Sequence, residues 1–476
     1  MIALLASLLF QCPDGTPPPC SRAAPVSARS VAVHNFRLLS RDSSDAYLAE
    51  GLADAVTSRL SQIERLEVAS RTAARLGRAP RAAFVVSGTM LRQNRRLVVN
   101  VELLRAATGR NAWAQRYDRP DTAVLDLERE IAVGVASAML PSVTPAERQA
   151  LGIGRAENPE AYDRLLRGDF LLARRNPTST AQAIREYEAA VRLEPTMASA
   201  HARIALASAI WFDWEWTPDA SAPPESILTK GIAAAERAIL LDSMSSDAWV
   251  AWAYVRSWSR PRTMDGVEAA FRRAIALDPR NAEAHAQYGD WLGAMERGAE
   301  SDSAQRRALA IDPLRTVTLR NLGGIELLDS AVRLQPDHYY NYILRGWTRL
   351  QSGDTAGARA DAETARRLQP PENRVVGMAD YAQQRMAFGD TAAARAVIDS
   401  AWALLPPTGP LGLRSLALGR ALFEAGDMER AFTVLERARP RGAVMWFGLM
   451  DNETDLTRLP ERARAVLEEA RPPWVR

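Results

Sequence analysis

Apolar residues recur at helical spacing over most of this chain, and prolines that end these helical stretches recur at a fixed distance. Each such proline follows an apolar stretch of the kind RRAIALDP, and proline stops a helix because it lacks an N–H group and clashes with the preceding turn. The same distance of 34 residues separates Pro279 from Pro313, Pro336 from Pro370, and Pro406 from Pro440. A period of this length predicts an array of helix pairs.

The pattern predicts about eight helix pairs over residues 158–440. The two helices of a pair cross closely only where one side chain is small, because a bulky side chain would hold the backbones apart. We expect the crossing points of three pairs at Gly168, Gly289 and Gly346. The fifth pair is predicted to be short, because only 23 residues separate the prolines around it, and the second pair has Ser243 where proline is expected.

The units resemble tetratricopeptide repeats in their period, their small crossing residues and their closing prolines. The resemblance implies an all-α right-handed superhelical solenoid with a concave surface that binds a protein or peptide. Grooves of this family that clamp a peptide carboxylate use Lys, Arg and Asn on the first helices. Here those positions hold other residues, including Ala286, Gln287 and Asp290, so the sequence predicts no carboxylate clamp.

Tryptophan and arginine in the repeats are candidates for a binding groove, because these residue types anchor many protein interfaces. With the repeat-ending proline as reference, we expect five residues to project into the concave groove: Trp249, Trp252, Arg256, Tyr340 and Trp347. An aromatic groove would suit a helix or an extended apolar peptide. The alternative is that these aromatic residues only pack between repeats, since aromatic residues at helical spacing often fill cores.

An α+β segment precedes the repeats, because strand-like and helix-like patterns alternate there. We expect strands at 31–36, 66–70, 83–91, 96–104 and 111–117, and helices at 44–63, 73–81 and 121–140. The RQNR sequence between the third and fourth strands is a hairpin signal.

This segment resembles the TolB-like amino-terminal domain over about residues 31–150. VAVHNF, DAYLAEGLADAVTSRLSQI, LEVASRT, VVSGTM and LVVNVELLRAATGRNAWAQRYDR carry the resemblance. Similar TolB-like and repeat regions often follow a kinase, cyclase or DNA-binding domain. The resemblance therefore implies a sensory or regulatory role in a bacterial signalling system as one reading of the chain.

The two ends of the chain differ in composition from the predicted domains. Residues 1–30 begin with the apolar leader MIALLASLLF and continue as a Pro-rich linker that carries Cys12 and Cys20, either as a disulfide or as two free thiols. The leader is too short to span a bilayer and predicts export to the cell envelope or periplasm, with a cytoplasmic location as the alternative. Residues 441–476 are predicted to cap the solenoid, which needs a polar terminal element.

Composition and motifs argue against catalysis and nucleic-acid binding. The net charge is only +3 over 476 residues, which gives no reason to expect nucleic acid. The sequence has no GxxxxGK[ST], HExxH, GxSxG or CxxC motif, and its four histidines are scattered. We therefore expect no enzyme activity, no cofactor and no metal site. The predicted function is a non-enzymatic scaffold that binds a protein or peptide, and the alternative is a sensory module that acts on a separate output protein.

Overall fold

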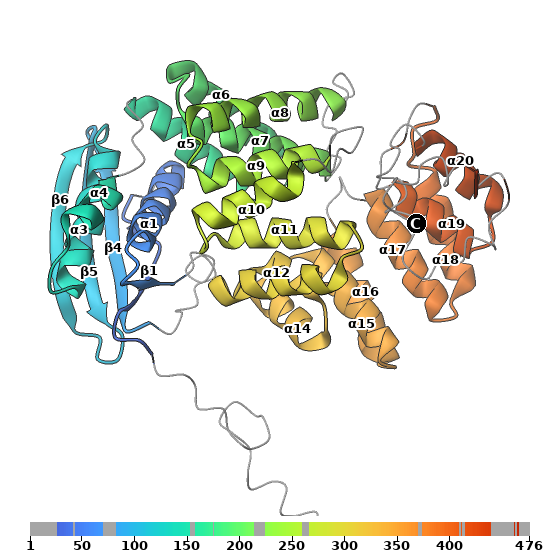
Figure 1. Ribbon diagram of the computed structural model, residues 1–476. Helices are drawn as coiled ribbons and strands as arrows, with labels where there is room; N and C mark the ends of the chain where they lie inside the picture. Colours follow the sequence, from blue (N-terminus) through green and yellow to red (C-terminus); the bar gives the residue numbers. More distant parts are fainter. Residues whose placement is uncertain are drawn as a thin grey trace, which may run out of the picture. The chain divides into compact units, whose positions relative to one another are not determined.

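The computed structural model divides the chain into two compact units, Met1–Arg155 and Ala156–Arg476 (Figure 1). It describes residues 26–40, 43–69, 82–152, 158–174, 176–213, 224–258, 266–369, 374–408, 411, 415–438, 461 and 464–465. Several predicted features lie outside these residues: the apolar leader, Cys12, Cys20, the helix expected at 73–81, and nearly all of the cap at 441–476.

The first unit contains a six-stranded mixed sheet with the order β3-β1-β4-β5-β6, and β2 pairs with β4. Its strands are β1 (Ser30–Val33), β2 (Arg37–Leu38), β3 (Glu67–Val68), β4 (Phe84–Gln93), β5 (Arg96–Arg105) and β6 (Asn111–Pro120). β1 runs parallel to β3 and β4, whereas β4, β5 and β6 form an antiparallel meander. Asn94 and Arg95 join β4 to β5 with φ values of 52° and 60°, which gives the tight hairpin that RQNR indicated.

Helices α1 (Ala46–Ser61) and α3 (Val124–Met139) contact each other and pack against one face of this sheet (Figure 1). A short 3-10 turn, η1 (Ser43–Asp45), leads into α1. Leu48, Leu52, Val56 and Leu60, which recur every four positions along α1, are all buried, as the apolar pattern predicts.

Helix α4 (Pro145–Gly152) begins with a capping box. The Thr144 hydroxyl accepts the Glu147 N–H at 3.2 Å, and the Glu147 carboxylate accepts the Thr144 N–H at 2.8 Å. The same carboxylate takes two hydrogen bonds, of 2.8 and 2.6 Å, from the Arg65 guanidinium. Arg65 thereby ties the start of α4 to the segment that follows α1.

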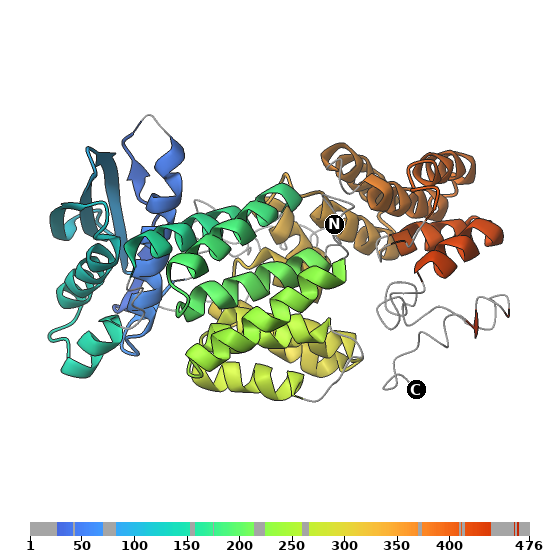
Figure 2. The ribbon, with the colours of Figure 1, turned by 90° about the horizontal axis from the view of Figure 1, so that it is seen from above.

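The described residues of the second unit form an all-α solenoid of eight helix pairs. The pairs are α5 (Pro159–Leu172) and α6 (Pro177–Leu193), α7 (Ala198–Asp213) and α8 (Pro224–Leu241), α9 (Ser246–Ser257) and α10 (Val267–Leu277), α11 (Ala282–Ala294) and α12 (Gly298–Ile311), α13 (Thr316–Leu322) and α14 (Ile325–Leu334), α15 (Tyr339–Gln351) and α16 (Thr355–Leu368), α17 (Arg374–Ala387) and α18 (Thr391–Trp402), and α19 (Ser415–Glu424) and α20 (Met428–Ala438). Figure 2 shows the green and yellow pairs from above, with paired helices side by side. An α+β unit followed by an all-α solenoid confirms the predicted fold class.

Small residues lie at the helix crossings, where the sequence placed them. A Cβ added to Gly168 would lie 2.3 Å from a ring carbon of Tyr187 on the partner helix. A Cβ on Gly289 would lie 2.8 Å from Gln305. The crossing at Gly346 is looser, because its added Cβ would lie 3.5 Å from Asp361 on the partner helix α16.

Helices α13 and α14, with 7 and 10 residues, make up the short fifth pair. Gly323 and Gly324 connect them with φ values of 67° and 84°. This left-handed backbone favours glycine, and it lets the chain reverse within two residues.

The first helices of several successive pairs lie side by side in the second unit. Contacts join α5 to α7, α7 to α9, α9 to α11, and α17 to α19. Among the residues that the structure describes, no helix has the length and apolar content needed to cross a membrane. In the same residues, no group of three or more His, Cys, Asp or Glu side chains is placed to hold a metal ion.

Candidate functional site

Trp249, the first of the predicted groove residues, is half-buried and packs against a core cluster of Val250, Ala274 and Ala284. Its indole N–H donates to the carbonyl oxygen of Ser243 at 2.9 Å. The ring therefore contributes to packing between α9, α10 and α11.

Trp252 and Arg256 lie one turn apart on α9 and stack, with the guanidinium carbon 5.4 Å from the ring centroid. Trp252 packs against the cluster that includes Val267 and Phe271 of α10. Its ring also meets that of Trp249 edge-on, with the centroids 6.5 Å apart. The structure thus brings three of the five predicted residues together on α9.

Tyr340 and Trp347 lie on α15 and pack against a separate cluster of Tyr339, Ile343 and Ala365. The guanidinium of Arg320 lies 5.7 Å from the centroid of the Tyr340 ring. Both aromatic side chains are half-buried. Whether any of the five predicted residues contacts a partner stays a prediction.

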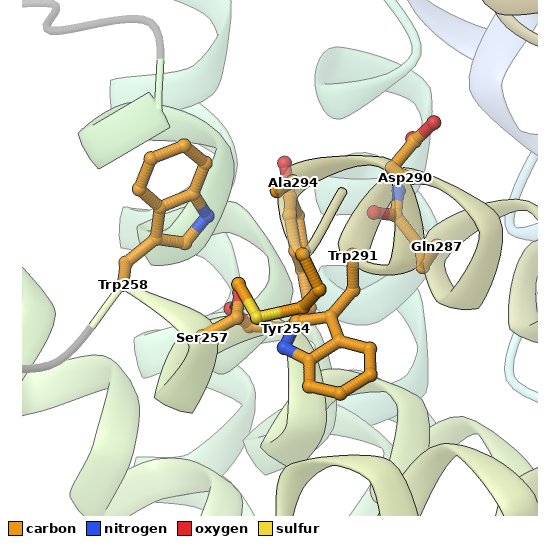
Figure 3. A pocket seen from close by; sticks show the side chains of 8 residues that line it. Tyr254, Ser257, Trp258, Gln287, Asp290, Trp291 and Ala294 are labelled. Carbon is orange, nitrogen blue, oxygen red and sulfur yellow. Dashed lines mark hydrogen bonds between the residues drawn. The ribbon is translucent and has the colours of Figure 1, made fainter. Parts of the chain in front are cut away.

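A cavity of about 270 Å³ opens between α9 and α11, the first helices of the third and fourth pairs. Its lining residues are Tyr254, Ser257, Trp258, Gln287, Asp290, Trp291, Ala294 and Met295. Figure 3 shows Trp258 on one side of the cavity and Trp291 and Asp290 on the other. Three aromatic side chains, together with Gln287 and Asp290, therefore line a single opening.

Neighbouring helices hold the polar side of this cavity in place. The Asp290 carboxylate accepts hydrogen bonds from the side-chain amides of Gln305 on α12, at 2.5 Å, and Asn321 on α13, at 2.6 Å. These two bonds orient the carboxylate. The Gln287 amide is likewise oriented, because it donates to Glu283 at 2.8 Å.

The aromatic wall is also fixed before any ligand arrives. Trp291 is only 6% exposed, and its ring stacks on that of Tyr288 with the centroids 6.1 Å apart and the planes 19° apart. Trp258 lies at the end of α9, and its ring centroid is 6.1 Å from that of Phe212. Packing of this kind makes the cavity a preformed feature of the repeats.

A guanidinium with several carboxylate neighbours lies near the α11 side of the cavity. Arg315, at the start of α13, pairs with Glu283 at 2.6 Å. Burial works against the charged form of Arg315, but the nearby carboxylates of Glu283, Asp312 and Asp290 outweigh it and hold the pKa of Arg315 above its ordinary value. Three carboxylates thus act on one guanidinium.

A second arginine, Arg203 of α7, also has several carboxylate neighbours. Arg203 pairs with Asp169 of α5 at 3.0 Å and lies 3.8 Å from Asp247 of α9. The attraction of Asp169 is the largest cause that raises the pKa of Arg203, and Asp247 and Glu283 add to it. Glu283 thus acts on both Arg203 and Arg315.

A second cavity, of about 190 Å³, lies between α16 and α17. It is lined by Arg359, Ala362, Glu363, Tyr381, Arg385 and Phe388. Asp390 pairs with both arginines, and a hydrogen bond from Tyr381 is the largest cause that lowers the pKa of Glu363. Acidic and basic side chains thus pair with each other around this cavity.

Sequence reasoning did not identify this cavity. It named Gln287 and Asp290 only as first-helix positions that lack the residue types of a carboxylate clamp, and both line the cavity. Tyr254 and Trp258 were not among the candidates, because α9 was aligned from the proline that closes its own pair. Counted from Ser243, which ends the preceding pair, Trp249 instead takes the position of His285 and Tyr342 in their pairs.

No family model matches the chain. It is 28% identical over 255 residues to a curated protein named "Putative adenylate cyclase 3" from Rhizobium meliloti strain 1021. The match covers 51% of this chain and 42% of that relative, so the chain spans less than half of the relative's length.

Several solved structures resemble the chain at low sequence identity. An IFIT1 monomeric mutant is 11% identical, covers 73% of this chain and 88% of its own, and has a TM-score of 0.48. Yeast Tom70 is 13% identical, with 69% and 78% covered and a TM-score of 0.39. TTC0263, a TPR protein of Thermus thermophilus, is 13% identical, with 48% and 99% covered and a TM-score of 0.29. With scores this low, the repeat assignment rests on the period and helix pairs of the chain itself.

Proposed function

We propose that this chain is a non-enzymatic scaffold that binds a protein or peptide on the face formed by its first helices, at the cavity between α9 and α11. The observation that carries the proposal is the grouping of Tyr254, Trp258 and Trp291 around one preformed opening. Large aromatic side chains in well-packed pockets are typical anchors of protein interfaces.

The architecture supports binding for a physical reason. A single helix pair cannot bury its apolar side alone, so stacking of successive pairs stabilises the fold and creates a long, continuous surface. Because the cavity walls are held by packing between helices, a ligand has little side-chain ordering to impose when it binds. The five residues predicted from the sequence flank this region or lie farther along the repeats, and contact through their exposed edges remains part of the proposal.

A cavity-filling variant tests the proposal. Ala294 lines the cavity and is half-buried, so Ala294→Phe should fill the opening without removing core atoms. Ala299 is exposed on α12 outside the cavity, so Ala299→Phe is the matched control. The full-length chain should capture a protein partner from an extract of its source organism. We expect Ala294→Phe to weaken capture at least about ten-fold and Ala299→Phe to leave it unchanged; equal capture by both variants would refute the assignment.

A second candidate function is a regulatory module that acts on a separate output protein, and the similarity to the curated cyclase favours it. The TolB-like identity of the first unit belongs to this proposal. Mass spectrometry of the captured partner separates the two functions. Capture of a nucleotide cyclase, a kinase or a DNA-binding protein would support the regulatory module. Capture of a partner without a domain of this kind would support only the scaffold function.

A further inference from the structure

We propose that the chain dimerises through the edge of its first unit, where β6 of one copy pairs antiparallel with β6 of a second copy. The inference goes beyond the proposed function, because it concerns the sheet and not the cavity of the repeats. β6 is the last strand in the sheet order, and Figure 1 shows it at the border of the sheet. It is ten residues long, and an edge strand of this length offers backbone groups to which another strand can bond.

The hydrogen bonds of the sheet show which backbone groups of β6 point outward. In an antiparallel ladder, only every second residue bonds through its backbone to a given neighbouring strand. The N–H of Asp121, just after β6, donates to the carbonyl oxygen of Arg95 at 2.9 Å, in step with the register of the two strands. The odd-numbered residues from 113 to 119 therefore bond to β5. Three residues between them turn their backbone groups away from the sheet: Ala114, Arg116 and Asp118.

The outer edge of β6 is open to a second strand. Among the described residues, β6 pairs with β5 alone. The carbonyl oxygen of Asp118 accepts from the guanidinium groups of Arg96, at 3.3 Å, and Arg119, at 3.1 Å. These two arginine side chains are 51% and 40% exposed, and each also has a carboxylate partner, at 2.7 and 2.8 Å. A strand N–H can thus take their place at the carbonyl while both ion pairs persist.

Two features confine regular pairing to the middle of β6. A bulge between Leu103 and Leu104 of β5 lies opposite the start of β6 and breaks the regular spacing there. At the other end, Pro120 has no N–H to donate. The outward groups in regular spacing therefore span only residues 114–118. With so few backbone bonds available, the side chains decide which partner strand fits and in which register.

The charges of this stretch complement a second copy of the same strand. When Tyr117 lies opposite its own copy, each Arg116 lies opposite the partner's Asp118, with about 5.5 Å between the Cα atoms. Arg116 is exposed and has no ion pair to a described residue. Asp118 is 46% exposed, and Arg96 bonds to its Oδ1 atom, so its Oδ2 side is available to a second guanidinium. Two-fold symmetry supplies this pair of opposite charges twice.

The neighbouring register is less favourable, which makes the charge pattern selective. A shift of the partner by two residues would keep the backbone bonds but place Arg116 opposite itself, and like charges directly opposite each other destabilise a strand pair. Charged side chains on an edge strand generally prevent indiscriminate pairing. In β6 they favour one self-complementary arrangement, which joins the two sheets into one and brings two repeat arrays into a single assembly.

Sedimentation velocity of the full-length chain tests the proposal. We expect a monomer–dimer equilibrium with a Kd at or below about 100 µM. Arg116→Asp and Asp118→Arg each place like charges opposite each other at both symmetric pairs, so each should weaken dimerisation at least about ten-fold. Asp126→Arg is the control for Asp118→Arg, because it makes the same change of charge at a 60% exposed position of α3 and should leave the dimer unchanged.

A mixture of the two single variants tests the register itself. In a mixed dimer the two reversed residues lie opposite each other, as do the two native ones, so opposite charges are restored at both pairs. An equimolar mixture should therefore dimerise like the wild type, and so should the double variant Arg116→Asp/Asp118→Arg. Circular dichroism melts that match the wild type would establish that the variants are folded.

Four outcomes would overturn the proposal. A wild-type chain that stays monomeric up to about 100 µM has no such interface. A dimer that persists in both single variants uses another surface. A mixture that stays monomeric excludes the pairing of Arg116 with the partner's Asp118, and loss of the dimer in Asp126→Arg would mean that the edge of β6 is not the determinant. None of these outcomes depends on capture of a partner by the repeats.

Discussion

The indole N–H of Trp249 donates a 2.9 Å hydrogen bond to the carbonyl oxygen of Ser243, six residues earlier in the chain. The same bond recurs in three other pairs: His201 to Pro195 at 3.1 Å, His285 to Pro279 at 3.1 Å, and Tyr342 to Pro336 at 2.9 Å. All four donors are the fourth residue of a first helix. The bond ties each first helix to the turn that closes the preceding pair.

The two histidines in this position predict a pH dependence of stability. Burial lowers the pKa of His201 and of His285, and a nearby arginine adds to the effect in each case. Because the folded pKa is below the unfolded value of about 6.5, the unfolded chain binds more protons, and stability falls as pH drops below about 6.5. Replacement of both histidines with tyrosine, as at Tyr342, should keep the hydrogen bond and flatten the melting temperature between about pH 7 and 5.5.

Circular dichroism melts of the full chain provide the measurement. The reciprocal variant, Tyr342→His, should add pH dependence in the same range, which controls for carboxylates that begin to titrate near its lower end. If the double tyrosine variant shows the same pH profile as the wild type, the two histidines do not contribute as proposed.

Trp249 also predicts the outcome of a stability experiment. Because its ring packs against the core of three helices, Trp249→Ala should lower the free energy of unfolding by about 2–3 kcal/mol. Trp249→Phe keeps most of the ring contact and loses only the bond to Ser243, so it should cost about 1 kcal/mol. Urea unfolding distinguishes the two variants. Equal losses of unfolding free energy in the two variants would show that the hydrogen bond, and not ring packing, accounts for most of the contribution of Trp249.

The position of Trp249 also shows which features the sequence alone could predict. The spacing of apolar residues and the closing prolines were sufficient to predict the helix pairs, because both are local features of the sequence. The side chains around the cavity depend on the register of α9, and the sequence places this register differently when it is counted from Ser243 and from Pro279. Trp249 and Trp258 both lie on or at the end of α9, but only Trp258 lines the cavity, and residue type alone does not separate them.

Gly168 predicts a packing effect at the first helix crossing. The added Cβ of Gly168→Ala would lie 2.3 Å from Tyr187, which is fully buried and donates to Asp169 at 2.8 Å. We expect a net loss of about 1–2 kcal/mol, even after the gain in helix propensity. Gly298→Ala is the control, because nothing lies within 4 Å of its added Cβ, and it should be neutral or slightly stabilising. Thermal melts of the two variants that shift equally would contradict the crossing geometry.

The ion pair of Glu147 with Arg65 predicts that this carboxylate of the first unit titrates at unusually low pH. Hydrogen bonds from Arg65, and then from Thr144, lower the pKa of Glu147 to about 2. Because the pKa is lowered in the folded chain, this carboxylate contributes to the stability of the fold above about pH 4.5. The contribution is lost as pH falls toward 2. Arg65→Gln should raise the pKa of Glu147 part of the way back to its ordinary value. Carboxyl NMR titration measures both values, and an unchanged pKa in the variant would exclude Arg65 as the main cause.

The first unit shows where sequence reasoning succeeds and where it stops. Alternating apolar residues and the hairpin signal located β4 and β5, and the turn at Asn94 and Arg95 follows directly. The parallel pairing of β1 with both β3 and β4 depends on contacts between distant segments. Strand patterns carry little information on such pairings, so the sheet order emerged only from the structure.

The central claim is that a partner contacts the cavity between α9 and α11, and site-specific photo-crosslinking tests it most directly. A benzoylphenylalanine would replace Ala294 in the cavity or, in a matched protein, the exposed Ala299 on α12. After irradiation in the source extract, the account predicts a crosslinked protein partner from position 294 and none from position 299. Crosslinking from position 299 alone, or equal crosslinking from both positions, would contradict it.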